Sequence, residues 1–167
     1  MSMGRAMAME LTHEGAPTRK HLERVPAELF DFAPHDKSMK MGALASHIAD
    51  SIGWAAPVVE TDELALDSSM KPFMATSTED LLATFDKNLE AAVAALKKAE
   101  DAKMGDTWSL KMDGNTVLSM PRAAVLRGMV LSHLVHHRAQ LGIYLRMNGI
   151  AVPSVYGPSA DEGPKFG

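Results

Sequence analysis

The sequence predicts an all-α protein, a four-helix bundle with a short β-hairpin before the last helix. Four segments carry apolar residues at intervals of three and four, the spacing that gives an α-helix one buried face. Between the last two of these segments, apolar residues flank Asp113-Gly114-Asn115 on both sides. That pattern is typical of two strands joined by a tight glycine turn.

The first helix is expected over residues 6–25. Gly15 and Pro17 weaken this prediction, because glycine adds backbone entropy to the unfolded chain and proline removes a helical hydrogen-bond donor. Pro26 is expected to stop or kink the helix. Residues 30–38, which contain proline and two aspartates, are expected to form a loop.

The second helix is expected to begin near Ser38 or Lys40 and to run to about residue 56, with Pro57 marking its end. His47 lies at the edge of its apolar stripe, so we expect this imidazole to be partly shielded from water. The stripe consists of Leu44, Ile48, Ser51, Ile52 and Ala55.

A polar connection over residues 60–77 precedes the third helix. Ser77 is a suitable cap for this helix, and the acidic residues that follow it suit the positive end of the helix dipole. The apolar face of the third helix continues to about residue 99. The hairpin is then expected over residues 106–120.

Pro121 is expected at the first position of the fourth helix, and Gly149 is expected to end it. The tail, residues 154–167, is rich in glycine and proline and is expected to pack as an irregular strap. The whole chain, residues 1–167, is expected to form a single domain. The core stripe of the fourth helix is Val125, Leu126, Met129, Val130, His133, Leu134, His137, Leu141, Tyr144 and Leu145.

Charge and composition exclude several classes of protein. The net charge is −4, and no basic run is longer than Lys97-Lys98, so nucleic acid is not an expected partner. No segment approaches the ~20 apolar residues of a membrane-spanning helix, and residues 1–15 lack the apolar run of a secretory signal. We therefore expect a cytoplasmic protein. The chain has no cysteine, which rules out thiolate metal ligands and a cysteine nucleophile.

His133 and His137 are the strongest candidates for chemistry. Residues four apart lie on the same face of a helix one turn apart, so two imidazoles can bind one metal ion. Both interrupt an apolar stripe, and a buried imidazole without a partner costs on the order of 1–3 kcal/mol. His47 is the only other histidine in a helical stripe and is the natural third ligand. The alternative is that these histidines are packed in the core or exposed on a helix surface.

The neighbours of these histidines have less specific expectations. Gln140 follows His137 by three and is expected to line the pocket; Asp50, three after His47, is expected to be exposed or to orient an imidazole. His136 is expected to have a structural role or to face solvent. Arg138 is expected to anchor the C-terminal strap through Asp161 or Glu162. Trp54 is more typical of a core or interface residue than of a ligand-stacking one.

Residues 44–49, 133–141, 144–146, 152–153 and 156–159 together resemble the DinB-like superfamily of damage-inducible four-helix bundles. The resemblance covers nearly the whole chain. It implies an up-down-down-up bundle, a homodimer, and one divalent metal ion held by His47, His133 and His137. Zinc and nickel are the metals that the resemblance implies, and iron is also compatible with three imidazoles. Ala139 departs from the glycine that many members have after the arginine.

The resemblance also implies a reaction, since characterised relatives include thiol-dependent S-transferases and a mycothiol-dependent isomerase. The leading hypothesis is a metal-dependent enzyme that binds a low-molecular-weight thiol and presents it as thiolate to a small electrophile. Metal-dependent hydrolysis of a small substrate stays open as an alternative, as does a non-enzymatic metal-binding stress protein. A bundle without metal, in which the histidines serve packing, is a further alternative.

Overall fold

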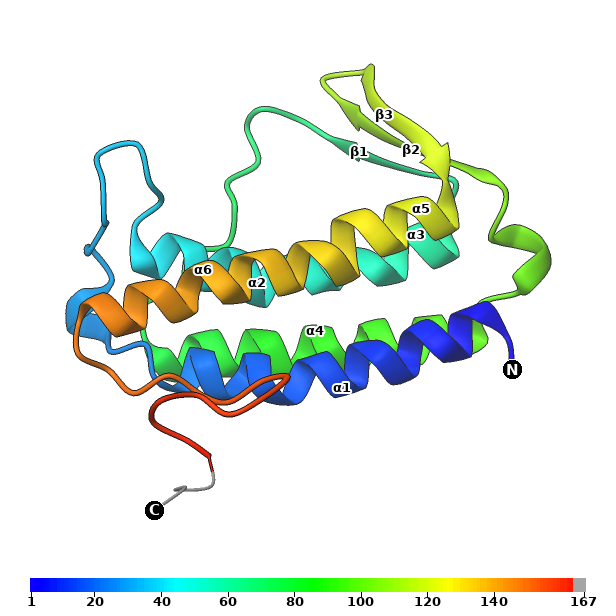
Figure 1. The fold of residues 1–167 in the computed structure, drawn as a ribbon. Helices are drawn as coiled ribbons and strands as arrows, with labels where there is room; N and C mark the ends of the chain where they lie inside the picture. The colour runs from blue at the N-terminus through cyan, green and yellow to red at the C-terminus, as the bar shows by residue number, and fades with distance from the viewer. Residues whose placement is uncertain (164–167) are drawn as a thin grey trace.

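The computed structural model describes residues 1–163 and shows long helices in a bundle with a small sheet above one end (Figure 1). In chain order, its α-helices are α1 (Met3–Glu23), α2 (Met41–Ser51), α3 (Ala55–Glu60), α4 (Thr78–Lys98), α5 (Arg122–Val125) and α6 (His133–Met147). Its strands are β1 (Glu63–Leu66), β2 (Thr107–Met112) and β3 (Asn115–Pro121). This architecture agrees with the predicted bundle and with the predicted hairpin before the last helix.

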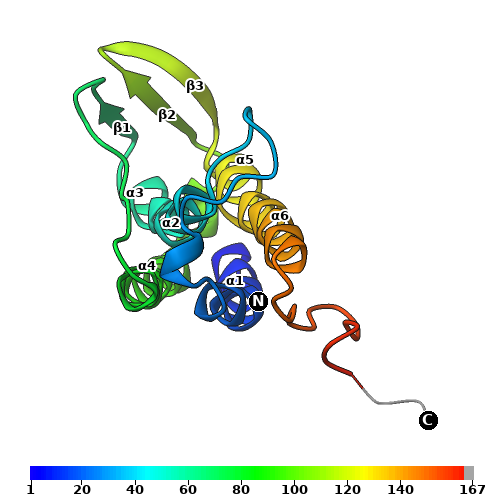
Figure 2. The ribbon, with the colours of Figure 1, turned by 90° about the vertical axis from the view of Figure 1, so that its left-hand side faces the viewer.

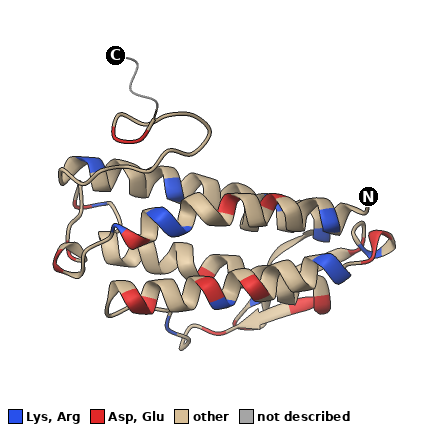
Figure 3. Cartoon of the chain, turned by 90° about the horizontal axis from the view of Figure 1, so that it is seen from below, with Lys and Arg blue, Asp and Glu red and all other residues tan. Residues whose placement is uncertain are grey.

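The bundle has up-down-down-up connectivity. Viewed from its end, α1 lies beside α4, α4 beside α2, and α2 beside α6 (Figure 2). Antiparallel α1 and α4 approach closely: a Cβ at Gly15 would lie 2.6 Å from Cδ2 of Leu89. The long crossover between α3 and α4 carries β1 over the bundle (Figure 1). Acidic and basic residues are interspersed along the helices (Figure 3).

Helix α1 begins three residues earlier than predicted, and neither Gly15 nor Pro17 interrupts it. Ser2 caps the helix, since its Oγ accepts a hydrogen bond from the backbone N–H of Arg5. Packing along α4 outweighs the local preferences of both residues, and the absent side chain of Gly15 allows the close contact with Leu89.

The prediction that Pro57 ends the second helix is wrong. A tight 3-10 turn over Ile52–Trp54 follows α2, and the chain then continues as α3 to Glu60. Pro57 lies in the first turn of α3, where its missing N–H leaves no intrahelical bond unmade. Helix α4, by contrast, agrees with its prediction: Ser77 accepts a hydrogen bond from the N–H of Asp80, and the helix ends at Lys98.

The predicted hairpin is confirmed, and its turn has positive φ at Asp113 (48°) and Gly114 (78°). The sequence did not predict β1, which pairs in parallel with β2 from Glu63↔Ser109 to Leu66↔Met112. Only four residues long, β1 depends on a partner more than forty positions away in the chain, so its local pattern carries little signal.

The fourth predicted helix also differs at its start. Pro121 is the last residue of β3 and the cap of α5 rather than the first helical residue. Seven residues, Leu126–Ser132, form a π-helical segment between α5 and α6. After α6, Gly149 adopts a φ of 71°, the left-handed conformation that commonly ends a helix at glycine.

The tail is irregular from residue 154 to residue 163, as predicted; residues 164–167 of the expected strap lie outside the described part. Arg138 does anchor the strap, but not through Asp161 or Glu162, which pair with Arg146 and Arg24. Instead, Arg138 donates a hydrogen bond to Oη of Tyr156 (2.9 Å).

Arg138 and Glu14 form a buried ion pair behind that contact. Their side chains are 3% and 9% exposed, and Nη1 lies 2.7 Å from Oε2. Arg138 also donates to Thr18 Oγ1, while Tyr156 donates to Glu14 Oε2 at 2.9 Å. Helix α1, helix α6 and the strap therefore meet at one satisfied polar cluster.

Replacing Arg138 with methionine should lower the free energy of unfolding by about 3–5 kcal/mol, because Glu14 would keep a buried charge without its partner. Urea unfolding followed by circular dichroism measures the loss. Arg146→Met is the matched control: it breaks the more exposed pair with Asp161 and should cost about 1 kcal/mol or less. Similar losses in the two variants would contradict the importance of the buried pair.

Candidate metal centre

His47, His133 and His137 come together across the antiparallel pair α2 and α6. His133 and His137 lie one turn apart at the start of α6, and His47 lies in the second half of α2. One ring nitrogen from each histidine lies within 4.8 Å of the other two. Nε2 of His47 is 2.7 Å from Nε2 of His133, and the ring centroids are 4.3–4.9 Å apart.

All three rings are half-buried at the edge of the bundle rather than inside its core. The residues that follow two of them, Ile48 and Leu134, are fully buried. Burial, and then the charge of His137, lowers the pKa of His133 to about 4. Burial likewise lowers the pKa of His47. Both rings are therefore neutral at pH 7, the form in which an imidazole binds a metal.

Gln140 holds the third ring in place. Its Oε1 lies 2.7 Å from Nδ1 of His137, the separation of a hydrogen bond in which the ring N–H donates. This contact leaves Nε2 of His137 as the ligand atom, matching the Nε2 atoms of His47 and His133. Asp50 makes no hydrogen bond to His47 within residues 1–163 and instead lines the neighbouring cavity.

The π-helical segment directly precedes His133 and sets the rotation of α6. A π-helix contains more residues per turn than an α-helix, so it changes which side chains face a neighbouring helix, and such segments often lie at functional sites. Leu131 is buried here although the regular stripe omitted it, and Met129 turns toward the cavity. Sequence periodicity could not reveal this shift, because it assumes one constant helical period.

A cavity of about 620 Å³ lies beside His47 and His133. Trp54 and Met129 line it from the helices, Leu66 and Met112 line it from the sheet, and Phe73 lines it from the loop before α4. Trp54 thus faces this cavity in addition to packing on the core. The residues from β1 and from the loop after it were not predicted, because only the parallel pairing of β1 with β2 places them over the histidines.

The remaining histidines are not part of this cluster. His136 is exposed on α6, one of its two expected placements, and its ring centroid lies 4.9 Å from that of His137; His13 and His35 are exposed as well. His21 is buried in α1, and its Nδ1 lies 2.7 Å from the carbonyl oxygen of Pro17. Throughout residues 1–163, no other cluster of three histidine, aspartate or glutamate side chains is close enough to hold a metal ion.

The donor set fits a divalent ion. Two nitrogen atoms bound to tetrahedral zinc are about 3.4 Å apart, given Zn–N bonds of about 2.0–2.1 Å. To bind an ion, the 2.7 Å distance between the Nε2 atoms of His47 and His133 would have to increase slightly. The ligand nitrogens of all three histidines already lie within 4.8 Å of one another, so small side-chain movements suffice. Three protein ligands leave at least one position open, as catalytic zinc sites do.

Comparisons with known proteins identify the family of this chain. The sequence profile described as "DinB family" matches residues 1–165. The chain belongs to the DinB family. The chain is also similar to the uncharacterized protein YrdA of Bacillus subtilis strain 168. The two are 24% identical over 155 residues, which cover 92% of this chain and 88% of YrdA.

Solved DinB structures share the fold. A DinB-like protein from Bacillus cereus ATCC 10987 has a TM-score of 0.68 and 21% identity, covering 90% of this chain and 95% of its own. DinB-like YjoA of Bacillus subtilis has a TM-score of 0.68 and 22% identity, with coverages of 90% and 96%. A DinB family member from Exiguobacterium sibiricum 255-15 has a TM-score of 0.62 and 17% identity, with coverages of 92% and 97%.

We expect the half-buried His133 to make the metal-free protein sensitive to acid. The folded chain holds the pKa of His133 at about 4, well below its ordinary 6.5. Between these values the unfolded chain binds a proton that the folded chain does not, so stability is lost as the pH falls through this window.

His133→Gln should therefore reduce the fall in melting temperature of EDTA-treated protein between pH 7 and pH 4.5. Differential scanning calorimetry measures the slope. His13→Gln, which replaces an exposed histidine of α1, is the control and should leave the slope unchanged. Identical slopes for His133→Gln and the unmodified protein would show that burial of this ring has no such effect.

Proposed function

We propose that this chain is a metal-dependent enzyme that transfers a low-molecular-weight thiol to a small electrophile. The observation that carries the proposal is the placement of three imidazoles within 4.8 Å of one another beside an apolar cavity of about 620 Å³. That volume is in the range of small-molecule sites. A purely structural metal site would be closed by protein ligands and would need no such cavity.

The residues of the site have separable roles in this proposal. His47, His133 and His137 hold the ion, and Gln140 orients the ring of His137. When bound, the ion supplies Lewis acidity that lowers the pKa of a thiol bound at the open position. Trp54 and Phe73 provide apolar walls that exclude water from a thiolate. Because the chain contains no cysteine, the sulfur has to come from the substrate.

Metal-dependent hydrolysis of a small substrate is the second candidate, and the position of Asp50 favours it. Asp50 lines the cavity three residues after His47, and no hydrogen bond or ion pair occupies its carboxylate within the described chain. A carboxylate in this position can accept a proton from an attacking water. A metal-binding stress protein without catalysis, in which the ion mainly stabilises the bundle, is the non-enzymatic alternative.

The proposal includes further features that come from the family. Zinc or nickel suits three imidazole ligands, and a homodimer is the expected assembly. No helix within residues 1–163 is long and apolar enough to cross a membrane. We place the protein in the cytoplasm, where small thiols are kept reduced and so are available as substrates.

Purified protein supplemented with zinc or nickel should bind about one equivalent of metal, as measured by inductively coupled plasma mass spectrometry after removal of free ions. His133→Ala should abolish binding because two imidazoles remain. His136→Ala, three residues along the same helix, should retain full occupancy. Less than about a tenth of an equivalent in the unmodified protein would contradict the metal site.

Thiol transfer should depend on that metal. A panel of cellular thiols with monobromobimane, followed by fluorescence, should show one thiol conjugated faster than its spontaneous rate. EDTA should remove the excess rate and zinc or nickel should restore it. His47→Ala should lower the rate on the order of 100-fold or more, whereas His136→Ala should not. Metal binding without turnover of any thiol would favour the hydrolase or the stress protein.

A further inference from the structure

Residues 67–76, which connect β1 to α4 (Figure 1), are called the covering segment here, because side chains from them line the cavity beside the histidines. The segment is fixed near both ends. The N–H of Ser68 donates to Asp113 Oδ1 (2.9 Å), and the N–H of Ala75 donates to Oγ of Ser46 (2.9 Å). Ser46 is buried and directly precedes His47, so the segment is tied to the helix that carries the site.

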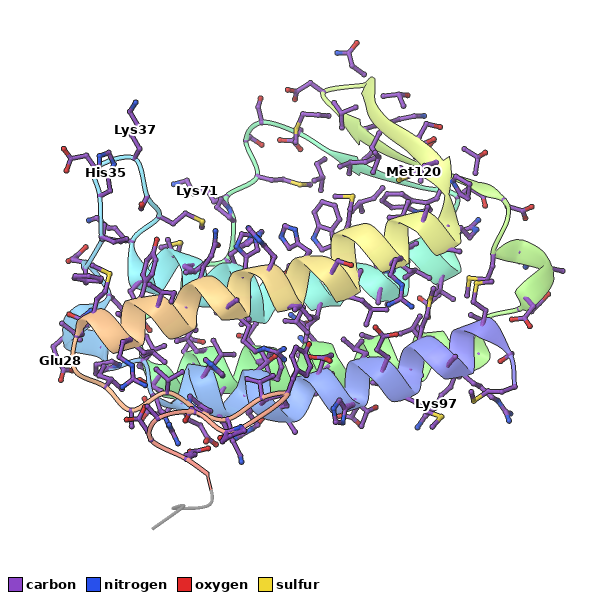
Figure 4. The ribbon with its side chains drawn as sticks, viewed as in Figure 1. Glu28, His35, Lys37, Lys71, Lys97 and Met120 are labelled. Carbon is purple, nitrogen blue, oxygen red and sulfur yellow. The ribbon has the colours of Figure 1, made fainter. Side chains whose placement is uncertain are left out.

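Lys71 lies on this covering segment, above the long helices (Figure 4). It is the only lysine or arginine among the described residues that line the cavity. No hydrogen bond or ion pair within residues 1–163 occupies its ammonium group, whereas the nearby Lys111 is paired with Glu63 at 2.5 Å. The cavity therefore has one cation that no protein carboxylate neutralises.

The two carboxylates that line the cavity are engaged differently. Asp67 accepts a hydrogen bond from the N–H of Ser69 (2.8 Å) and another from its hydroxyl, and these bonds lower the pKa of Asp67. Asp50 is close enough to His47 for its negative charge to favour the protonated form of that ring. A divalent ion bound by the histidines would carry two positive charges against the single negative charge of Asp50. The cavity would then have an excess of positive charge.

The rest of the cavity is apolar. Trp54 and Phe73 offer aromatic faces, and Met70, Met112 and Met129 offer flexible thioether side chains that adapt to ligands of different shapes. A volume of about 620 Å³ holds much more than a metal-bound thiol alone. A ligand that fills it therefore has an apolar body as well as a charge.

We infer that this cavity binds an amphiphilic carboxylate, with its apolar body against Trp54, Phe73 and Met129 and its carboxylate at Lys71. The inference rests on the proposed function for the divalent ion in the cavity and for the identity of the ligand, which is either the thiol or its electrophile. Lys71 is then a specificity-determining residue that selects acidic over neutral substrates. An exposed charge pair at the mouth of an apolar site gives a preference of several-fold rather than an absolute requirement.

The test compares 2-naphthoate with its neutral isostere 2-naphthamide by isothermal titration calorimetry, on EDTA-treated and on zinc-loaded protein. On the zinc-loaded protein we expect the acid to bind about 5-fold more tightly than the amide. Lys71→Met should remove this preference and Lys71→Arg should retain it. Lys97→Met, which deletes the same charge at the far end of α4 (Figure 4), should leave it unchanged.

The carboxylate of 2-naphthoate can also bind zinc, which by itself would favour the acid over the amide. The decisive quantity is therefore the decrease in the ratio of acid to amide affinity that Lys71→Met causes. Equal affinities for acid and amide in the unmodified protein would overturn the inference, and so would a preference that survives Lys71→Met. Neither result depends on thiol turnover. The inference can therefore fail while the proposed function stands, and it can hold if monobromobimane shows no conjugation.

Two kinetic arms then identify the source of the carboxylate. The first compares 3-mercaptopropionate with 3-mercaptopropionamide as the thiol for monobromobimane. The second compares 4-(bromomethyl)benzoate with its amide as the electrophile for 2-mercaptoethanol. The arm in which Lys71→Met lowers the acid-to-amide ratio of kcat/KM by about 5-fold contains the natural acidic partner. Unchanged ratios in both arms would contradict a role for Lys71 in substrate choice.

Discussion

The antiparallel contact between the helical column α2–α3 and the column α5–α6 is the constraint on which the rest of the structure depends. Polar contacts join the two columns along their length. Oη of Tyr144 donates to the carbonyl oxygen of Met39 at one end, and Nη1 of Arg122 donates to that of Val58 at the other. The contact between His47 and His133 lies between them. A shift of either column would separate the imidazoles and open the cavity beside them.

Helix α6 serves the core, the candidate site and the strap at once because its faces differ. Leu134, Leu141 and Leu145 are fully buried in the core. His133 and His137 face α2, while Arg138 faces α1 and the C-terminal strap through its pair with Glu14. The ring of Tyr156 lies under the guanidinium, 5.4 Å from it, and adds a cation–π contact. The strap thus stabilises α6, which carries two of the three histidines, on the side that faces α1 rather than α2.

The small sheet determines what can reach the histidines. Strand β1 pairs with β2 and carries the chain across the top of the bundle, so that the covering segment returns to α4 over the site. Without this crossover, His47 and His133 would face open solvent at the edge of the helices. Our proposal of an enzyme, rather than of a protein in which an ion only stabilises the bundle, depends on the combination of three clustered imidazoles with an apolar cavity beneath this segment.

The sequence by itself determined the long helices, the hairpin and the three candidate ligands. Helical periodicity is local, since side chains three and four apart share a face, and this alone placed His133 beside His137 and put His47 at the edge of a stripe. The family resemblance then implied that the helix of His47 and the helix of His133 and His137 contribute to one site. It also correctly implied the up-down-down-up order of the bundle.

Only the tertiary structure decided the features that depend on distant partners. Pro57 continues a helix because a 3-10 turn precedes it, and Arg138 pairs with Glu14 because α1 lies behind α6. The π-helical turn before His133 changes the helical period itself, and β1 exists only where β2 accepts it. Local preferences of a few tenths of a kcal/mol per residue cannot specify such arrangements, because burial and pairing of distant segments outweigh them.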